Sequence, residues 1–294
     1  MRDHLRRIGL GSVQFGTPYG IANKENITPA LSDVSFILET ARASGITVID
    51  TAINYGESER LLGELGMQGF NVVTKLPSLR GAGLHDWRSM VEQIKGSVNR
   101  LGLSKLHAVL LHDQYDLTEV WGSEVYRALV EIKNSGLADL IGVSIYDPNI
   151  LPEIIPKYDI DIVQAPLNLV DRRIIDPKFI ELLQKANIKL HTRSCFLQGL
   201  LLMDISDIPP RFGSWLEIFR LFDSWCIGSG ISKVEACLHF VLSFPIVETL
   251  IVGVQETSQF LEIIKVCETL PKSRGYPEIA SLDLELIDPS KWTT

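Results

Sequence analysis

The sequence is poor in positive charge and in long apolar runs, and these shortages argue against two classes of partner. Among its 294 residues, lysine and arginine number 28 against 36 aspartates and glutamates. The resulting net charge of −8 argues against a nucleic-acid partner, because phosphate binding depends on clustered cations. No apolar run reaches the roughly 18 residues that a membrane-spanning helix needs, so no membrane partner is expected.

Cysteine is also scarce. The four cysteines (Cys195, Cys226, Cys237 and Cys267) form no CxxC pair and no metal-ligand spacing, so no metal site is predicted. The cationic start, MRDHLRRIGL, lacks the apolar core of a signal peptide. Scattered thiols without an export signal indicate a reducing, cytoplasmic environment.

What the sequence does contain is a repeating alternation of strand and helix patterns. Eight short apolar runs read as strands: IGLGSVQF, TVIDTA, NVVTKL, HAVLLHD, LIGVSIYD, DIVQAPLNL, KLHTRSC and TLIVGV. They are continuous rather than alternating, as expected for parallel strands covered on both faces. Eight such units predict an α/β fold, a (β/α)8 TIM barrel in a single domain over residues 1–294. Residues 271–294 lack helical periodicity and are expected to be a C-terminal tail that packs on the barrel.

Helix boundaries follow from the residues at the ends of the amphipathic runs. Asp33 and Asp86 fit N-caps. Glycine or asparagine follows several helices, where a left-handed residue is least strained: Gly45, Gly102, Gly136 and Asn187. The unit between Leu190 and Thr249 is longer, and it is expected to hold a loop and two helices, WLEIFRLFDSW and SKVEACLHFVLSF.

An open dinucleotide-binding sheet is the main competing fold. It requires G-x-G-x-x-G between the first strand and a helix. Gly9 and Gly11 fit, but position 14 is glutamine, and a loop-like segment follows Gly16. The spacing therefore disfavours that fold.

Four polar residues stand at the ends of predicted strands: Asp50, Tyr55, Lys75 and His112. Each alone has an ordinary interpretation, such as a helix cap, a tyrosine packed at a turn, a solvated lysine or a core histidine. The carboxyl ends of barrel strands meet at the face where chemistry takes place in this architecture. A phenol, an ammonium, a carboxylate and an imidazole at that face can donate a proton to a carbonyl oxygen.

These residues resemble the catalytic tetrad of the aldo-keto reductase family. The resemblance covers nearly the whole chain, through LGSVQFG, DTAINYGESERLLG, VVTKL, LLHD, GVSIYD, VQAPLNL, FLQGLL and IVGVQETSQFLEII. It implies a barrel that binds NADP(H), less often NAD(H), at the carboxyl ends of the strands, with no metal. It also implies roles: Tyr55 donates the proton, Lys75 lowers the pKa of Tyr55, Asp50 holds Lys75, and His112 orients the carbonyl.

The resemblance further implies cofactor contacts. Ser144 and Gln164 would bind the nicotinamide carboxamide, although Ile145 stands where the family usually has asparagine; both could instead satisfy backbone groups. Contacts to the pyrophosphate would come from Ser194, Phe196 and Gln198, and Phe196 could equally be a core residue. Gly11 and Ser12 would lie beside the ribose, unless Gly11 is only a strand glycine.

Two departures from the family pattern affect the cofactor. Arg193 replaces the aromatic residue that stacks on the nicotinamide; it could raise the reduction potential of the bound cofactor, or point outward and bind a substrate carboxylate or phosphate. After the last strand, the positions of the usual 2′-phosphate cations hold Gly253, Gln255 and Gln259. Glu262 and Glu256 could accept hydrogen bonds from ribose hydroxyls, so the sequence also predicts use of NAD(H).

The function predicted from these features is NAD(P)(H)-dependent reduction of an aldehyde or ketone, the substrate being polar or sugar-like. Substrate contacts are expected from Tyr19, Asn54, Tyr146, Arg172, Arg173, the loop after Met203, and Trp292. A cofactor-sensing regulatory subunit and a sugar dehydrogenase working oxidatively remain alternatives. The sequence leaves the oligomeric state open.

Overall fold

A ring of eight parallel strands forms the centre of the molecule. The computed structural model describes residues 3–23, 27–80, 86–269 and 275–292. The strands pair in chain order and the ring closes between the last and the first, which confirms the predicted (β/α)8 barrel. The strands are β1 (Ile8–Gly11), β2 (Val48–Asp50), β3 (Asn71–Leu76), β4 (Leu106–Leu111), β5 (Ala138–Ser144), β6 (Ile162–Pro166), β7 (Lys189–Arg193) and β8 (Val247–Gly253).

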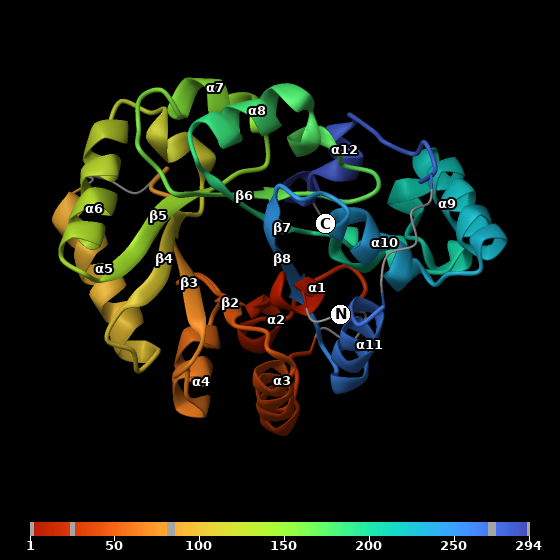
Figure 1. Cartoon of the computed structure of the whole chain (residues 1–294), viewed down its shortest axis with the longest axis horizontal. Coiled ribbons are helices and arrows are strands. Elements are labelled where there is room, and N and C mark those ends of the chain that lie inside the picture. The colour runs from red at the N-terminus through yellow and green to blue at the C-terminus, as the bar shows by residue number, and fades with distance from the viewer. Residues whose placement is uncertain (1–2, 24–26, 81–85, 270–274, 293–294) are drawn as a thin grey trace.

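Helices cover the outside of the ring (Figure 1). The longer ones that follow the strands are α3 (Leu31–Ser44), α4 (Ser58–Leu65), α5 (Trp87–Arg100), α6 (Gly122–Asn134), α8 (Pro177–Lys185), α10 (Lys233–Leu242) and α11 (Thr257–Cys267). Shorter pieces are α1 (Asp3–Arg6), α2 (Val13–Gly16), α7 (Leu151–Ile154) and α12 (Leu284–Ile287). None of the described helices is long and apolar enough to cross a lipid bilayer.

The core has two layers, because successive strand residues point to opposite faces. On β4, Ala108 and Leu110 belong to a small cluster inside the ring, whereas Val109 and Leu111 pack outward under the helices. Both sets are buried, which explains why the strands read as continuous apolar runs.

Most predicted helix ends are correct. The left-handed residues expected at the ends have φ values of 79° at Gly45, 63° at Gly102, 74° at Gly136 and 54° at Asn187. Asp86 caps α5 by accepting from the Arg88 amide at 3.0 Å.

The predicted N-cap at Asp33 is wrong. Helix α3 begins one turn earlier, after Ala30, so Asp33 lies in the first turn. There its carboxylate accepts from the Thr257 hydroxyl at 3.2 Å and joins α3 to α11. The negative charge still lies near the positive end of the helix dipole.

The long unit between β7 and β8 contains the two predicted helices, α9 (Leu216–Ser229) and α10. They lie together at one side of the barrel (Figure 1). The tail crosses the loop after β6, where Arg172 donates to the Pro277 carbonyl at 2.6 Å and the Ser281 amide donates to Val170 at 2.8 Å. The buried tail residues include Ile279 and Leu286.

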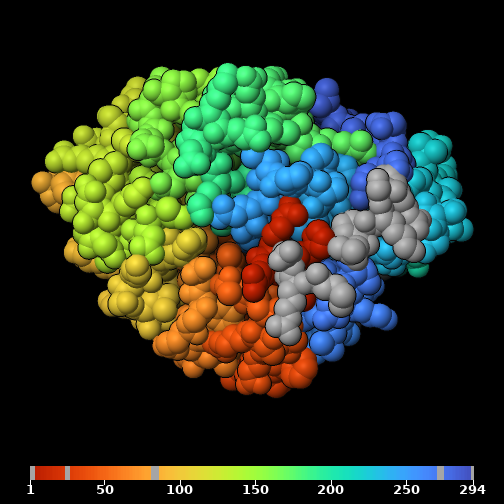
Figure 2. All heavy atoms as spheres, viewed as in Figure 1, coloured from red at the N-terminus to blue at the C-terminus, as the bar shows by residue number. Residues whose placement is uncertain are grey.

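The N-terminal segment is fastened to the last third of the chain. The Arg7 guanidinium donates to three backbone carbonyls, those of Leu242, Phe244 and Val247. The space-filling view shows the same association, with red N-terminal atoms lying against blue atoms of the C-terminal part (Figure 2). This attachment holds β1 against β8 and so helps to close the ring.

Candidate active site

One pocket of about 510 Å³ opens at the carboxyl ends of the strands. Every predicted catalytic and cofactor-binding residue lines it: Gly11, Ser12, Asp50, Tyr55, Lys75, His112, Ser144, Gln164, Arg193, Ser194, Phe196, Gln198, Gly253, Gln255, Gln259 and Glu262. The topology therefore brings together residues that lie far apart in the sequence.

Asp50 and Lys75 form a buried ion pair at the bottom of this pocket. Asp50 ends β2, and the Lys75 ammonium on β3 donates to its Oδ1 at 2.5 Å and to the Thr51 carbonyl at 2.9 Å. Only 1% of the Lys75 side chain is exposed. Burial lowers the pKa of Lys75, and the charge of Asp50 opposes that shift.

The second oxygen of Asp50 is also engaged. Gln164 on β6 donates to Oδ2 at 2.7 Å, and Oε1 of Gln164 accepts from the Ser144 hydroxyl at 3.3 Å. The two residues predicted to bind a carboxamide are thus hydrogen-bonded to each other, and Gln164 is oriented by Asp50.

Tyr55 is positioned by a tight turn after β2. Its amide donates to the Ala52 carbonyl at 3.1 Å, and its carbonyl accepts from the Ser58 amide at 3.0 Å. Gly16 packs directly against this turn, since a Cβ there would lie 1.8 Å from the Tyr55 carbonyl oxygen. The ammonium of Lys75 lies 5.2 Å from the centre of the Tyr55 ring.

The expectation that Lys75 lowers the pKa of Tyr55 is wrong for the free protein. Burial raises the pKa of Tyr55, and the negative charge of Asp50 raises it further. The cation that opposes this rise is Arg193. The reason is that Asp50, in direct contact with Lys75, offsets the charge of Lys75. Tyr55 is therefore a protonated phenol, which is the form that donates a proton.

His112 completes the group. Its ring stands edge-on to the Tyr55 ring, with the ring centres 5.6 Å apart. Burial lowers the pKa of His112 to about 4, and the charges of Lys75 and Arg193 add to the effect. The imidazole is neutral near pH 7, so it can donate one hydrogen bond to a carbonyl oxygen.

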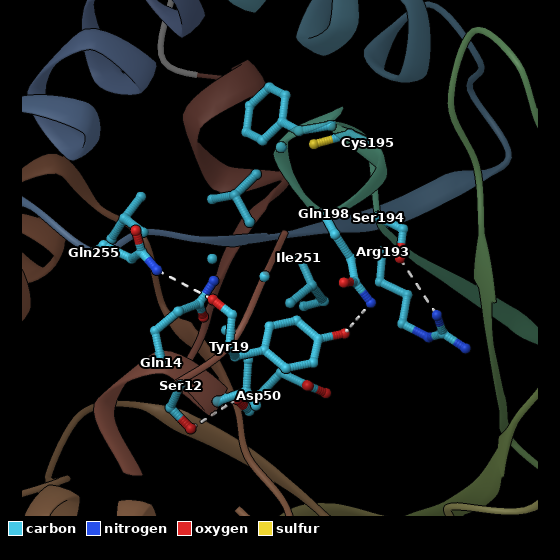
Figure 3. Close-up of a pocket in the computed structure, with 18 of the residues that line it drawn as sticks. Ser12, Gln14, Tyr19, Asp50, Arg193, Ser194, Cys195, Gln198, Ile251 and Gln255 are labelled. Carbon is cyan, nitrogen blue, oxygen red and sulfur yellow. Dashed lines mark hydrogen bonds between the residues drawn. The ribbon is translucent and has the colours of Figure 1, made fainter. Parts of the chain in front are cut away.

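Arg193 ends β7 with its guanidinium carbon 4.1 Å from the centre of the Tyr146 ring. It donates to the Ile145 carbonyl at 3.1 Å and to the Ser194 hydroxyl at 3.3 Å, the latter drawn in Figure 3. Tyr146 thus occupies one face of the guanidinium.

The loop after β7 has an unusual backbone. Three non-glycine residues adopt left-handed φ angles: Ser194 at 62°, Leu197 at 47° and Gln198 at 54°. Such residues carry a conformational cost and are concentrated at functional sites.

One residue of this loop, Gln198, and one residue after β8, Gln255, are joined to the loop after β1. The Gln198 amide donates to the Tyr19 hydroxyl at 3.0 Å, and the Gln255 amide donates to the Tyr19 carbonyl at 3.1 Å. Figure 3 shows the Tyr19 ring lying between the two glutamines. Tyr19 therefore connects three parts of the pocket rim.

The sequence interpretation missed Gln14 as a site residue. Its Oε1 is buried and has no hydrogen-bond partner among the described residues, although Gln14 lines the pocket. A Cβ on Gly253 would lie 2.5 Å from the Gln14 amide nitrogen, so the glycine makes room for this side chain. The signal was present in LGSVQFG, where Gln14 closely follows β1.

The predicted substrate contacts divide into two groups. Tyr19 and Tyr146 line the pocket. The others are outside its lining: Asn54, Arg172, Arg173, Trp292 and the loop after Met203, although Met203 itself lines the pocket. Arg173 pairs with Asp171 at 2.8 Å. The Trp292 ring stands edge-on to that of Phe212, with the ring centres 4.9 Å apart.

The sequence matches the profile of the Aldo/keto reductase family over residues 7–283. The chain belongs to this family. It is similar to the oxidoreductase YqkF of Bacillus subtilis (strain 168), with 26% identity over 286 residues, covering 89% of this chain and 87% of the relative. A shorter similarity, 29% over 120 residues, links it to 2,5-diketo-D-gluconic acid reductase B of Corynebacterium sp. (strain SHS752001), covering 39% of this chain and 41% of that protein.

Among solved structures, an aldo-keto reductase of Bacillus halodurans superposes with a TM-score of 0.73 at 19% identity, covering 91% of this chain and 88% of the other. That likeness concerns the fold. Family membership makes the chain an aldo-keto reductase, an NAD(P)H-dependent carbonyl reductase.

The pocket suits such a cofactor. The unpartnered Oε1 of Gln14 offers an acceptor at the wall formed by β1 and β8. Gly11 and Gly253 present no side chains there. The loop after β7 contributes Ser194, Phe196 and Gln198 to the lining of the same pocket.

Proposed function

We propose that this reductase converts small polar or sugar-like aldehydes and ketones to alcohols, with Tyr55 as the proton donor. A nicotinamide cofactor bound in the pocket would supply the hydride for the carbonyl carbon. Tyr55 gives its hydroxyl proton to the carbonyl oxygen, so the C=O bond becomes CH–OH. The phenolate left behind regains a proton from solvent.

The observation that carries this proposal is the convergence of Tyr55, His112 and the Asp50–Lys75 pair in one pocket. His112 is neutral and adjacent to Tyr55, so it can donate to the carbonyl oxygen and orient it. As the alkoxide forms, the cation Arg193 stabilises the negative charge that passes to Tyr55.

A polar substrate is favoured by the lining of the pocket. Tyr146 and Arg193 line it together with His112, and Tyr19 adds a hydroxyl at the rim. The reductase from Corynebacterium, whose name specifies a keto sugar acid, is one of the similar proteins. This similarity supports a sugar-like substrate for the present chain.

The test compares Tyr55→Phe with the wild type on a panel of short aldehydes and aldoses. The variant keeps the ring but removes the proton, so turnover should fall by roughly 100-fold or more, the scale of general-acid catalysis. Nucleotide binding, followed by fluorescence, should persist. Tyr115→Phe, a change at an exposed tyrosine outside the pocket lining, is the control. Equal turnover of Tyr55→Phe and the wild type would reject the role of Tyr55.

We also propose NAD(H) as the preferred cofactor. The part of the pocket lined by α11 contains Gln259 and Glu262, and Lys75 and Arg193 are the only lysine or arginine side chains among the described residues that line the pocket. A carboxylate repels a 2′-phosphate but accepts a hydrogen bond from a 2′-hydroxyl.

Fluorescence titration with NADH and NADPH tests this preference. NADH should bind at least roughly 10-fold more tightly, and Glu262→Lys should reverse the order. Lys24 lies outside the described residues, so the Lys24→Ala variant is titrated with the same two nucleotides. Tighter binding of NADPH to the wild type would reject the proposal, and a loss of that binding in Lys24→Ala would identify the source of the phosphate contact.

A further inference from the structure

The inner end of the pocket carries an uncompensated positive charge. Asp50 and Lys75 neutralise each other in direct contact at 2.5 Å. His112 is uncharged, because its pKa is lowered to about 4. Tyr55 is also uncharged, since burial raises its pKa. Arg193 remains as a guanidinium, which stays protonated in proteins.

Arg193 differs from the other partly buried arginines in how its donors are used. Arg173 pairs with the Asp171 carboxylate at 2.8 Å. Arg7 donates to three backbone carbonyls. Arg193 donates to one carbonyl and one hydroxyl, and within the described chain no carboxylate lies within ion-pair distance of it. A guanidinium has five N–H groups. Arg193 therefore retains donors for a ligand in the pocket that it lines.

The guanidinium is also held in place before any ligand arrives. One face lies on the Tyr146 ring at 4.1 Å. The backbone of Tyr146 is fixed in turn, because its amide donates to Oε1 of Gln114 at 2.7 Å and its carbonyl accepts from Arg173 at 2.9 Å. A preorganised cation binds an anion with less loss of conformational entropy than a mobile surface side chain.

Arg193 lies close enough to the reacting group for its charge to act there. It lowers the pKa of Tyr55 against the effects of burial and Asp50. Its charge also acts on the Tyr19 hydroxyl at the rim. A substrate whose carbonyl reaches Tyr55 therefore places its remaining atoms within the field of Arg193.

We propose that Arg193 binds a negatively charged group of the substrate, so that the preferred substrates are carbonyl compounds bearing a carboxylate or a phosphate. The proposal rests on the function proposed above and specifies its substrate class. Because Asp50 and Lys75 compensate each other, Arg193 is the cation that can bind an anionic group of the substrate. The planar guanidinium donors match the oxygens of a carboxylate or a phosphate.

Matched substrate pairs test this selectivity. The carboxylate pair is 4-oxobutanoate and 4-oxobutanamide, and the phosphate pair is D-glyceraldehyde 3-phosphate and D-glyceraldehyde. The carboxylate pair differs mainly in charge, and the phosphate pair differs by the phosphoryl group. The ratio of kcat/KM within a pair cancels effects on the cofactor or on Tyr55. The wild type should favour the anionic member by roughly 10- to 100-fold, the scale of a charge-assisted hydrogen bond. The pair with the larger ratio identifies the anion.

Two variants assign the selectivity to Arg193. Arg193→Gln removes the charge and should bring the ratio close to one. Arg193→Lys keeps the positive charge but lacks the planar guanidinium, so it should keep part of the preference for the anionic substrate. A ratio near one in the wild type, or an equal ratio in wild type and Arg193→Gln, would overturn the proposal. A change only in the relative affinities for oxidised and reduced nucleotide would instead assign Arg193 to the nicotinamide and also overturn it.

A binding measurement separates this inference from the proposed function. Succinate and succinamide are titrated calorimetrically at low ionic strength, where no turnover is needed. The wild type should bind succinate, Arg193→Gln should not, and succinamide should bind neither. If no carbonyl compound is reduced but succinate binding depends on Arg193, the catalytic proposal fails while the anion site stands. If succinate binds both proteins equally, the anion site fails.

Discussion

Gln164 donates to Oδ2 of Asp50 at 2.7 Å, while Lys75 occupies Oδ1 of the same carboxylate. The two donors come from β6 and β3, so the carboxylate of β2 joins strands that are not neighbours in the ring. The residue that compensates the charge of Lys75 therefore also connects distant parts of the barrel interior.

Breaking the Asp50–Lys75 pair should be costly for stability. Asp50→Asn leaves a buried ammonium without its counter-ion, so the free energy of unfolding at pH 7 should fall by about 3–5 kcal/mol in urea denaturation. The double variant Asp50→Asn/Lys75→Met should lose less than the sum of the single changes, with a coupling of about 1–3 kcal/mol. The exposed Lys105–Asp139 pair is the control, and Asp139→Asn should cost less than about 1 kcal/mol. Additive single changes would contradict the coupling.

Gly16 should be intolerant of any side chain. A Cβ at this position would lie 1.8 Å from the Tyr55 carbonyl oxygen and 2.5 Å from the Ser58 amide nitrogen, both backbone atoms that cannot rotate away. Gly16→Ala should therefore displace the turn that carries Tyr55, with a loss of at least about 2 kcal/mol of stability and reduced turnover. Thermal unfolding and kinetics measure both effects. Gly213→Ala is the matched control and should change little, because no atom of the described residues lies within 4 Å of a Cβ there.

Acid should destabilise the protein through His191. This imidazole on β7 is 1% exposed, and neither ring nitrogen has a hydrogen-bond partner among the described residues. Burial lowers the pKa of His191 from 6.5 to about 4, so the unfolded chain takes up the proton first as the pH falls. Stability is complete above pH 6.5 and should decline toward pH 4, by about 2 kcal/mol at pH 5 from this group alone.

His191→Leu removes the titrating group and both unpartnered nitrogens. Urea unfolding between pH 7 and pH 4.5 should then show a shallower slope than in the wild type. Identical slopes would mean that other groups govern the acid sensitivity.

The Tyr19 hydroxyl should govern how long a nucleotide remains bound. It accepts from the Gln198 amide at 3.0 Å and thereby joins the loop after β1 to the loop after β7, two walls of the pocket. Tyr19→Phe removes the acceptor, so dissociation of the reduced nucleotide should accelerate by roughly 3- to 10-fold in stopped-flow fluorescence. Gln198→Leu should give a similar rate, and the double variant should add little. An unchanged dissociation rate in Tyr19→Phe would show that the contact does not retain the nucleotide.

The barrel and the lining of its pocket were predictable from the sequence because both depend on local patterns. Each strand is a short apolar run, and Asp50, Lys75 and His112 stand at or near the strand ends. In a closed parallel barrel such positions lie on the same face, so the fold alone brings them together.

The electrostatics of the site were not predictable in the same way. The direction of the pKa shift of Tyr55 depends on a sum over burial, Asp50 and Arg193, and the charge of Lys75 is largely offset by its contact with Asp50. Sequence order identifies these groups but not the distances between them. The strand-end pattern therefore predicts which polar groups meet in the site. It does not predict the protonation state of the Tyr55 phenol.

Two further features depended on contacts that no local signal reveals. Tyr19 and Gln198 are 179 positions apart, and nothing in either segment indicates the hydrogen bond between them. Asp33 satisfies the sequence rule for a cap, but the helix begins after Ala30 and Thr257 provides the carboxylate with a different partner.

The left-handed backbone of Gln198 has a practical meaning for engineering. Glycine would adopt the φ of 54° at this position with less strain, so Gln198→Gly should relieve backbone strain in the folded protein. The same change would delete the amide that fastens Tyr19. A Gln198→Gly variant would thus release the nucleotide faster, and it would require a higher nucleotide concentration to remain saturated.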